Sequence, residues 1–355
     1  MKAGYRKTIA MKRRWVLWLL VILFVWVVIS RFAQIRQLAE TLAQGQWEWV
    51  LVAGLLQAIS YLGFAAMFQR GFRAVSVYYR FADILAVTLA SIFVNTVAPF
   101  GGASGIVLFV DDAAQRGESA ARASAGTLLA LMAEYGTFAL MVFAGLGYLF
   151  AHDNLRTYQI AGSAVLLAVV VVLGAALMLG VWRFEWLRRL LDWIRRTVNR
   201  AAVRLHRAAI LPEEWAARNA AEFAEAAAAL RDRRREIART WLAALAMHVV
   251  SLASLVFLFL AFYRPVGLGV LVAGFAMGNL FRLVAFTPQG IGLVEGVMTL
   301  VYTSLGVPAS TATVISLAFR GLSFWLPLLV GFILVRQVKS FRSEKNAPMP
   351  AHDGA

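Results

Sequence analysis

Six long apolar stretches are the feature that most constrains the fold of this chain. They lie near residues 15–34, 47–68, 122–150, 158–182, 241–263 and 309–335. Each is close to the roughly 20 apolar residues that a membrane-spanning helix needs. Lipid offers the backbone no hydrogen-bond partner, so spanning segments of this kind fold as helices. The sequence therefore predicts an all-α, polytopic helical membrane protein with six full crossings.

Two further apolar segments, 81–115 and 268–304, are each broken by a glycine-rich stretch that begins with a proline. The breaks read Pro99-Phe-Gly-Gly-Ala-Ser-Gly105 and Pro288-Gln-Gly-Ile-Gly292. Proline lacks an N–H donor and disfavours helix in the residue before it, whereas glycine permits positive φ. We therefore expect each segment to be a re-entrant helical hairpin, which enters the membrane and leaves it on the same side.

The positions of the basic residues support this topology. The chain holds 35 Lys and Arg residues and has a formal charge of +16. With two re-entrant hairpins, all but six of them face the cytoplasm, as the positive-inside rule requires. The exceptions are four outward residues (Arg31, Arg36, Arg156 and Arg264) and two membrane residues (Arg282 and Arg320). Because the charge lies in connections between apolar stretches, we expect no nucleic-acid partner and both termini in the cytoplasm.

The two halves of the chain correspond under a shift of 189 residues. The superimposed positions are Pro99 on Pro288, Gly101 on Gly290, Gly117 on Gly306 and Ala120 on Ala309. Since the two hairpins would enter from opposite sides, we expect an inverted-topology repeat, in which substrate sites form near the bilayer midplane. The expected divisions are a cytoplasmic basic N-terminus with the first membrane helix (1–46), repeat half 1 (47–150), an extra membrane helix with a cytoplasmic basic amphipathic linker (151–240), repeat half 2 (241–337) and a disordered cytoplasmic tail (338–355).

Four charged residues are candidates for the membrane interior: Glu134 and Arg320 lie near the middle of their crossings, and Arg282 and Glu295 lie on the two arms of the second hairpin. Ionisable groups inside a membrane are costly and are functional by default. Arg282 and Glu295 lie at similar depth on the two arms of the second hairpin, which suggests that they form an ion pair. Structural roles stay open, because Glu295 can cap the helix that starts after Gly292 and the arginines can bind carbonyls freed at the breaks.

The other candidate substrate-binding residues lie at or beside the two breaks. They are Asn95, Pro99, Gly101, Gly102, Gly105, Asn279, Pro288, Gly290 and Gly292. A returning half-helix starts at each break with unpaired N–H groups and the positive end of its dipole, which suits an anion such as a phosphate headgroup. Glycine-mediated packing of the hairpins is the alternative. With no cysteine and only four scattered histidines, we expect neither a metal nor another cofactor.

Several of these residues carry a resemblance to a known family. Pro288-Gln-Gly-Ile-Gly-Leu-Val-Glu295, with Asn95-Thr-Val-Ala-Pro-Phe-Gly-Gly102 upstream and the helix of Arg320 downstream, resembles the flippase-like transmembrane region of lysylphosphatidylglycerol synthases and its stand-alone relatives. The family motif is Pro-Gly-Gly-x-Gly-x-x-Glu, and Gln289 replaces its first glycine. The resemblance implies movement of an anionic phospholipid or a lipid-linked envelope precursor between leaflets of a bacterial cytoplasmic membrane. It does not imply aminoacyl transfer, which belongs to a separate soluble domain.

Two other functions stay open at this point. An ion- or proton-coupled secondary transporter of a small polar solute would use the same repeat, with Glu134 or Glu295 as its proton site. An integral-membrane enzyme is disfavoured, because no cluster of His, Asp and Glu suited to acid–base or metal chemistry falls at one depth. We therefore expect a protein that is not an enzyme, whose partners are membrane lipids with an anionic headgroup. Assembly as a homo-oligomer stays open.

Overall fold

The computed structural model describes residues 22, 40, 45–97, 103–204, 208–263, 265–285 and 287–338. Over these residues the chain is helical, and none of them forms a strand. Nearly all of the predicted first crossing, the tail beyond 338, and Pro99, Gly101 and Gly102 of the first break lie outside the described residues.

Five of the six predicted crossings lie in the described residues, and all five are confirmed as helices long and apolar enough to span a membrane. They are α3 (Trp47–Ala74), α6 (Ala120–Ala151), α7 (Thr157–Trp182), α10 (Arg234–Phe262) and the run Ala309–Leu334. This last run consists of α13 (Ala309–Arg320), a π-helical turn η3 (Gly321–Trp325) and α14 (Leu326–Leu334), and a short turn η4 (Val335–Gln337) follows it. The fold is therefore that of a polytopic helical membrane protein.

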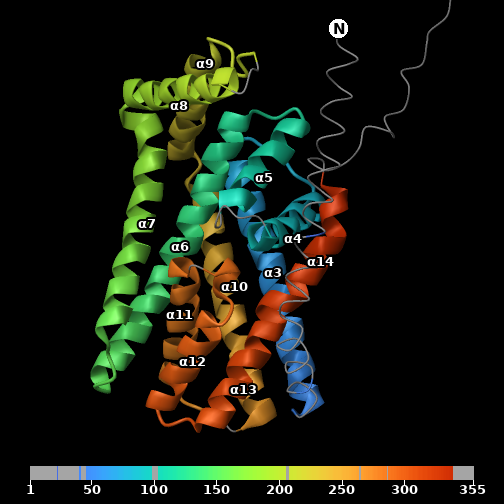
Figure 1. The fold of residues 1–355 in the computed structure, drawn as a ribbon, viewed down its shortest axis with the longest axis vertical. Coiled ribbons are helices and arrows are strands. Elements are labelled where there is room, and N and C mark those ends of the chain that lie inside the picture. The colour runs from blue at the N-terminus through green and yellow to red at the C-terminus, as the bar shows by residue number, and fades with distance from the viewer. Residues whose placement is uncertain are drawn as a thin grey trace, which may run out of the picture.

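Each predicted hairpin is present as two short helices. The first consists of α4 (Phe81–Val97) and α5 (Ala103–Gln115), and the second of α11 (Leu268–Val284), a short turn η2 (Pro288–Gly290) and α12 (Leu293–Ser304). The longest of these helices has 17 residues, or about 25 Å at 1.5 Å per residue, less than the hydrocarbon thickness of about 30 Å. In Figure 1 the first hairpin lies toward the end of the molecule that carries α8 and α9, and the second lies toward the opposite end.

Apolar side chains form two cores, one around each hairpin. In the first, α3, α4, α5 and the start of α6 pack together, and the ring of Phe68 stacks on that of Phe109 with centroids 4.0 Å apart. In the second, the end of α6 packs with α10, α11, α12 and α13, where Phe259 meets Tyr302 edge-on at 5.2 Å. Polar groups that belong to neither core are thereby left between the two hairpin tips.

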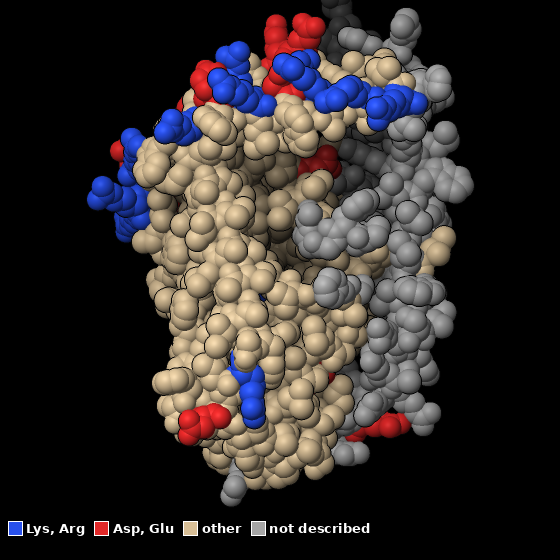
Figure 2. Space-filling view, turned by 60° about the vertical axis from the view of Figure 1, so that its left-hand side comes forward, with Lys and Arg blue, Asp and Glu red and all other residues tan. Residues whose placement is uncertain are grey.

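The predicted linker is confirmed as helical. α8 (Phe184–Arg204) lies across the end of α7 in Figure 1, and α9 (Trp215–Ala229) and a short turn η1 (Leu230–Asp232) lead into α10. One face of α8 packs on α9, while Trp186, Leu190 and Trp193 are exposed. Figure 2 shows Lys and Arg side chains gathered at this end of the molecule. Contact of α8 with an anionic lipid surface stays a prediction.

Candidate functional site

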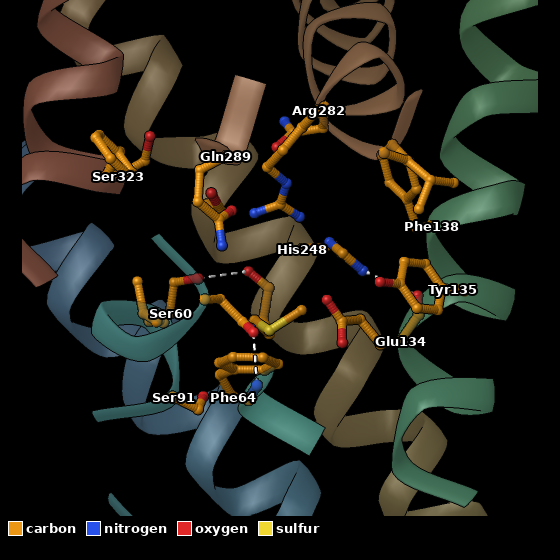
Figure 3. Close-up of a pocket in the computed structure, with 18 of the residues that line it drawn as sticks. Ser60, Phe64, Ser91, Glu134, Tyr135, Phe138, His248, Arg282, Gln289 and Ser323 are labelled. Atoms are coloured by element: carbon orange, nitrogen blue, oxygen red, sulfur yellow. Dashed lines mark hydrogen bonds between the residues drawn. The ribbon is translucent and has the colours of Figure 1, made fainter. Parts of the chain in front are cut away.

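A cavity of about 610 Å³ lies between the two hairpins and draws its walls from α3, α4, α5, α6, α7, α10, α11 and α13. Its polar and charged lining residues include Gln57, Ser60, Tyr61, Ser91, Asn95, Glu134, His248, Ser251, Asn279, Arg282, Thr287, Gln289, Arg320 and Ser323. Figure 3 shows the side chains of Glu134, Arg282 and Gln289 pointing into this shared space. Five of the predicted site residues thus meet at one cavity together with Gly105 of the first hairpin.

Arg320 is buried at the wall of the cavity with only 4% of its surface exposed. Its Nε donates to Glu295 Oε1 at 3.0 Å, and its Nη2 donates to the backbone oxygen of Gln289, also at 3.0 Å. Its guanidinium also lies over the ring of Phe324, 4.6 Å from the ring centroid. Arg320 therefore joins α13 to the second hairpin through an ion pair and through a carbonyl freed at the break.

The predicted ion pair between Arg282 and Glu295 is wrong. Glu295 Oε1 binds Arg320, and its Oε2 accepts from the backbone N–H of Gly292 at 2.7 Å, which is the predicted capping arrangement. Depth along the two arms of a hairpin does not fix the direction in which a side chain points. The partner of Glu295 instead comes from a third helix, 25 residues further along the chain.

Arg282 is the charge of the second hairpin that the protein leaves uncommitted. Its side chain is exposed to the cavity and makes no ion pair with any described residue. Figure 3 places its guanidinium between Gln289 and His248. Since an arginine stays protonated, this group brings a full positive charge to the cavity.

Glu134 brings the opposite charge from α6. It is only 8% exposed and lines the cavity, and its carboxylate makes no hydrogen bond or ion pair with any residue of the described ranges. His248 Nε2 lies 3.2 Å from the backbone oxygen of Glu134. A carbonyl oxygen can only accept, so this nitrogen of His248 carries a proton, and the ring packs against Phe138 at 5.6 Å.

The asparagines bind backbone rather than each other. Asn95 Oδ1 accepts from the backbone N–H of Gly105 at 2.6 Å, which links the two arms of the first hairpin. A Cβ added at Gly105 would lie 2.4 Å from Asn95 Nδ2, so the Asn95 side chain would have to shift and its bond to the Gly105 N–H would be disturbed. Asn279 Nδ2 donates to the backbone oxygen of Phe275 on its own helix at 2.9 Å. Both asparagines still line the cavity.

The second break reverses the chain through residues with positive φ. Gln289 has φ 52°, Gly290 has φ 70° and Gly292 has φ 87°. This is the left-handed region that favours glycine. Gln289, which replaces the first glycine of the motif, adopts this left-handed conformation itself. The glutamine adds a side chain that points into the cavity (Figure 3).

Three cavity residues of α3, Gln57, Ser60 and Tyr61, were not predicted. The Tyr61 hydroxyl donates to the backbone oxygen of Ser323. Pro327, four residues after Ser323, has no N–H to donate to that carbonyl, so the tyrosine takes the place of the missing helical donor. The signal was present in the sequence, because three polar residues at helical spacing interrupt an otherwise apolar crossing.

Within the described ranges no group of three or more His, Asp or Glu side chains lies close enough to hold a metal ion. Among the described residues, the cavity offers charge and hydrogen bonding from the guanidinium of Arg282, the carboxylate of Glu134 and several amide and hydroxyl groups.

Comparison with known proteins agrees with this architecture. Residues 15–331 match the family model of the lysylphosphatidylglycerol synthase TM region. A UPF0104 membrane protein of Pyrococcus horikoshii is 23% identical over 333 residues, which cover 89% of this chain and 93% of that protein. A UPF0104 membrane protein of Methanothermobacter thermautotrophicus is 30% identical over 88 residues, or 25% of this chain and 26% of that protein. Because the family model covers most of its length, the chain belongs to the family of the lysylphosphatidylglycerol synthase transmembrane region.

Proposed function

We propose that this protein is a lipid translocase. It moves a lipid with an anionic phosphate in its headgroup, either a phospholipid or a lipid-linked envelope precursor, between the leaflets of a bacterial cytoplasmic membrane. The observation that carries the proposal is the uncommitted guanidinium of Arg282, which faces a cavity between two opposed hairpins. An ionisable group that faces a cavity inside a membrane protein marks a substrate or ion pathway by default.

The hairpin tips themselves are less available to an anion than their sequence suggests. The Gly292 N–H at the start of α12 donates to Glu295, and the Gly105 N–H near the start of α5 donates to Asn95. Each tip has thus already satisfied one of its free N–H groups with a side chain. We therefore assign the phosphate to Arg282, with Gln289 beside it, and assign to the glycines the role of shaping the turn.

The wall formed by α7 fits a ligand that stays partly in lipid. α7 contributes Val169 and Leu173 to the cavity. In its most apolar 18-residue stretch, however, only 17% of the residues are buried inside the protein. Most of α7 therefore faces the acyl chains of the membrane. A lipid could place its headgroup in the cavity while its acyl chains remain in the membrane. A protein that moves lipids between leaflets has to allow this arrangement.

The test is translocation in proteoliposomes of fluorescent phospholipids that carry an anionic phosphate in the headgroup, with ethanolamine and glycerol headgroups both tried. Arg282→Gln should slow translocation by at least about tenfold, since it removes one charge-assisted contact with phosphate. The matched control is Arg189→Gln, which removes an exposed arginine on α8. Equal translocation by the wild type and Arg282→Gln would contradict the role of Arg282, and no translocation by the folded wild type would contradict the function.

The second candidate is an ion- or proton-coupled transporter of a small polar solute. It is favoured by Glu134, whose buried carboxylate has no partner in the described residues and so suits a proton site. Glu295 suits that role less well, because Arg320 and the Gly292 N–H occupy both of its oxygens. Solute uptake that depends on a pH gradient, without lipid movement, would favour this candidate.

A further inference from the structure

Two opposite charges face the same cavity without forming an ion pair with each other. Arg282 and Glu134 both line it, and the described residues provide no ion pair for either. Figure 3 shows them on different walls, with His248 between them. Arg320 and Glu295 already form an ion pair, so together they add no net charge to the cavity.

The described protein provides no hydrogen-bond donor to the carboxylate of Glu134, which opens onto the cavity. The residue is more than nine-tenths buried, and the nearby His248 Nε2 proton is directed to the backbone oxygen of Glu134 and not to its side chain. A carboxylate accepts hydrogen bonds and carries a full negative charge, so leaving it unpaired in a buried site is costly. When a phosphate occupies Arg282, the negative charge of Glu134 is still uncompensated.

We propose that the ligand carries a primary ammonium group beside its phosphate, with the phosphate bound at Arg282 and the ammonium at Glu134. The inference rests on the proposed function and narrows its substrate to a dipolar phosphate ester of the phosphoethanolamine type. An ammonium supplies both the positive charge and the N–H donors that Glu134 lacks. A quaternary ammonium supplies the charge alone, and a glycerol headgroup supplies donors without the charge.

The experiment compares three fluorescent phospholipids that share their acyl chains and differ only in an ethanolamine, choline or glycerol headgroup. Wild-type proteoliposomes should move the ethanolamine lipid at least about tenfold faster than the choline lipid, the effect of one charge-assisted hydrogen bond. Glu134→Gln should bring the two rates together, whereas Glu134→Asp, which keeps the carboxylate, should retain the preference. The control Glu225→Gln alters a carboxylate of α9 whose side chain is 70% exposed, and it should retain the preference in full.

Gel filtration and thermal unfolding of each variant separate a loss of preference from a loss of folding. Equal rates for all three lipids in the wild type would overturn the ammonium assignment while leaving the translocase function in place. An equal loss of all three lipids in folded Glu134→Gln would also overturn it, because that result indicates a coupling site. Release of encapsulated phosphoethanolamine without any lipid movement would contradict the translocase function while supporting the headgroup chemistry.

Discussion

At the scale of single residues, Arg320 and Glu295 tie the second hairpin to α13. The pair is nearly buried, with side-chain exposures of 5% and 15%. Arg320 also holds the Gln289 carbonyl, and Glu295 also holds the Gly292 N–H. Each side chain therefore pairs with the opposite charge and with one backbone group. Removing either side chain leaves that charge and that backbone group without their partner.

We predict that Arg320→Gln and Glu295→Gln each destabilise the protein by about 3–5 kcal/mol, because each leaves a buried charge unpaired. The double variant should cost less than the sum of the two, since it removes both charges together. Thermal unfolding in detergent measures these shifts. The matched control is Arg188→Gln, whose ion pair with Glu185 is exposed and should contribute little. Additive losses in the double variant would show that the two residues do not act as a pair.

The sequence predicted which residues form the site better than it predicted how they pair. Glu134, Arg282, Glu295 and Arg320 were identified because charged residues are rare within apolar stretches of the sequence. The spacing from Gly292 predicted that Glu295 caps the helix. The Arg282–Glu295 pair was wrong, because pairing depends on how helices from distant parts of the chain are turned toward each other. No spacing within one hairpin contains that information.

At the scale of elements, the reversal between α11 and α12 depends on backbone that other residues rarely adopt. Gly290 has φ 70°, and a Cβ there would lie 2.7 Å from Val294 Cγ2 and 3.1 Å from the Cα of Arg282. A side chain at this position would therefore push the tip away from the residue that faces the cavity.

We predict that Gly290→Ala destabilises the protein by about 1–3 kcal/mol and slows lipid translocation, through left-handed strain and contact with the backbone of Arg282. The control is Gly296→Ala in α12, where a Cβ meets nothing within 4 Å. That change should be neutral or stabilising by up to about 1 kcal/mol, because alanine favours helix. Unfolding temperature and translocation rate are measured for both variants. If the two behaved alike, the turn would not require a glycine at 290.

Proline and glycine predicted that each of the two segments is divided into two short helices, because those residues act through local backbone chemistry. The π-helical turn after Arg320 was not predicted, although Pro327 lies close to it. That turn is stabilised from outside its own helix by the Tyr61 hydroxyl, which binds the Ser323 carbonyl. Local sequence can show that a helix will be disturbed, but the form of the disturbance depends on which partner is available.

At the scale of the whole molecule, the two hairpins approach each other from opposite ends of the bundle (Figure 1). Each is surrounded by its own apolar core, and residues of both hairpins line the cavity. The count of crossings and the charge distribution led to the prediction of two opposed hairpins, and the entry of these hairpins from opposite faces of the membrane stays a prediction. The cavity could not be predicted from the sequence, since eight helices contribute to its walls.

We predict that the open ends of the two hairpins lie on opposite faces of the membrane. The sequence contains no cysteine, so Gln115→Cys at the end of α5 and Thr303→Cys near the end of α12 would each add a single thiol at an exposed position. A membrane-impermeant maleimide applied to intact cells should label Thr303→Cys. In inverted vesicles it should label Gln115→Cys. Labelling of both thiols from the same face would exclude the inverted repeat.

The depth of the hairpin tips has a consequence for the distance that a polar group must travel. The hydrocarbon layer of a membrane is about 30 Å thick. The break between α11 and α12 lies inside the bundle, away from both ends of the molecule, in Figure 1. A headgroup held at Arg282 would therefore be bound within the hydrocarbon layer and at neither surface of the membrane. The passage of the headgroup would be divided into two shorter steps, one from each leaflet to the site.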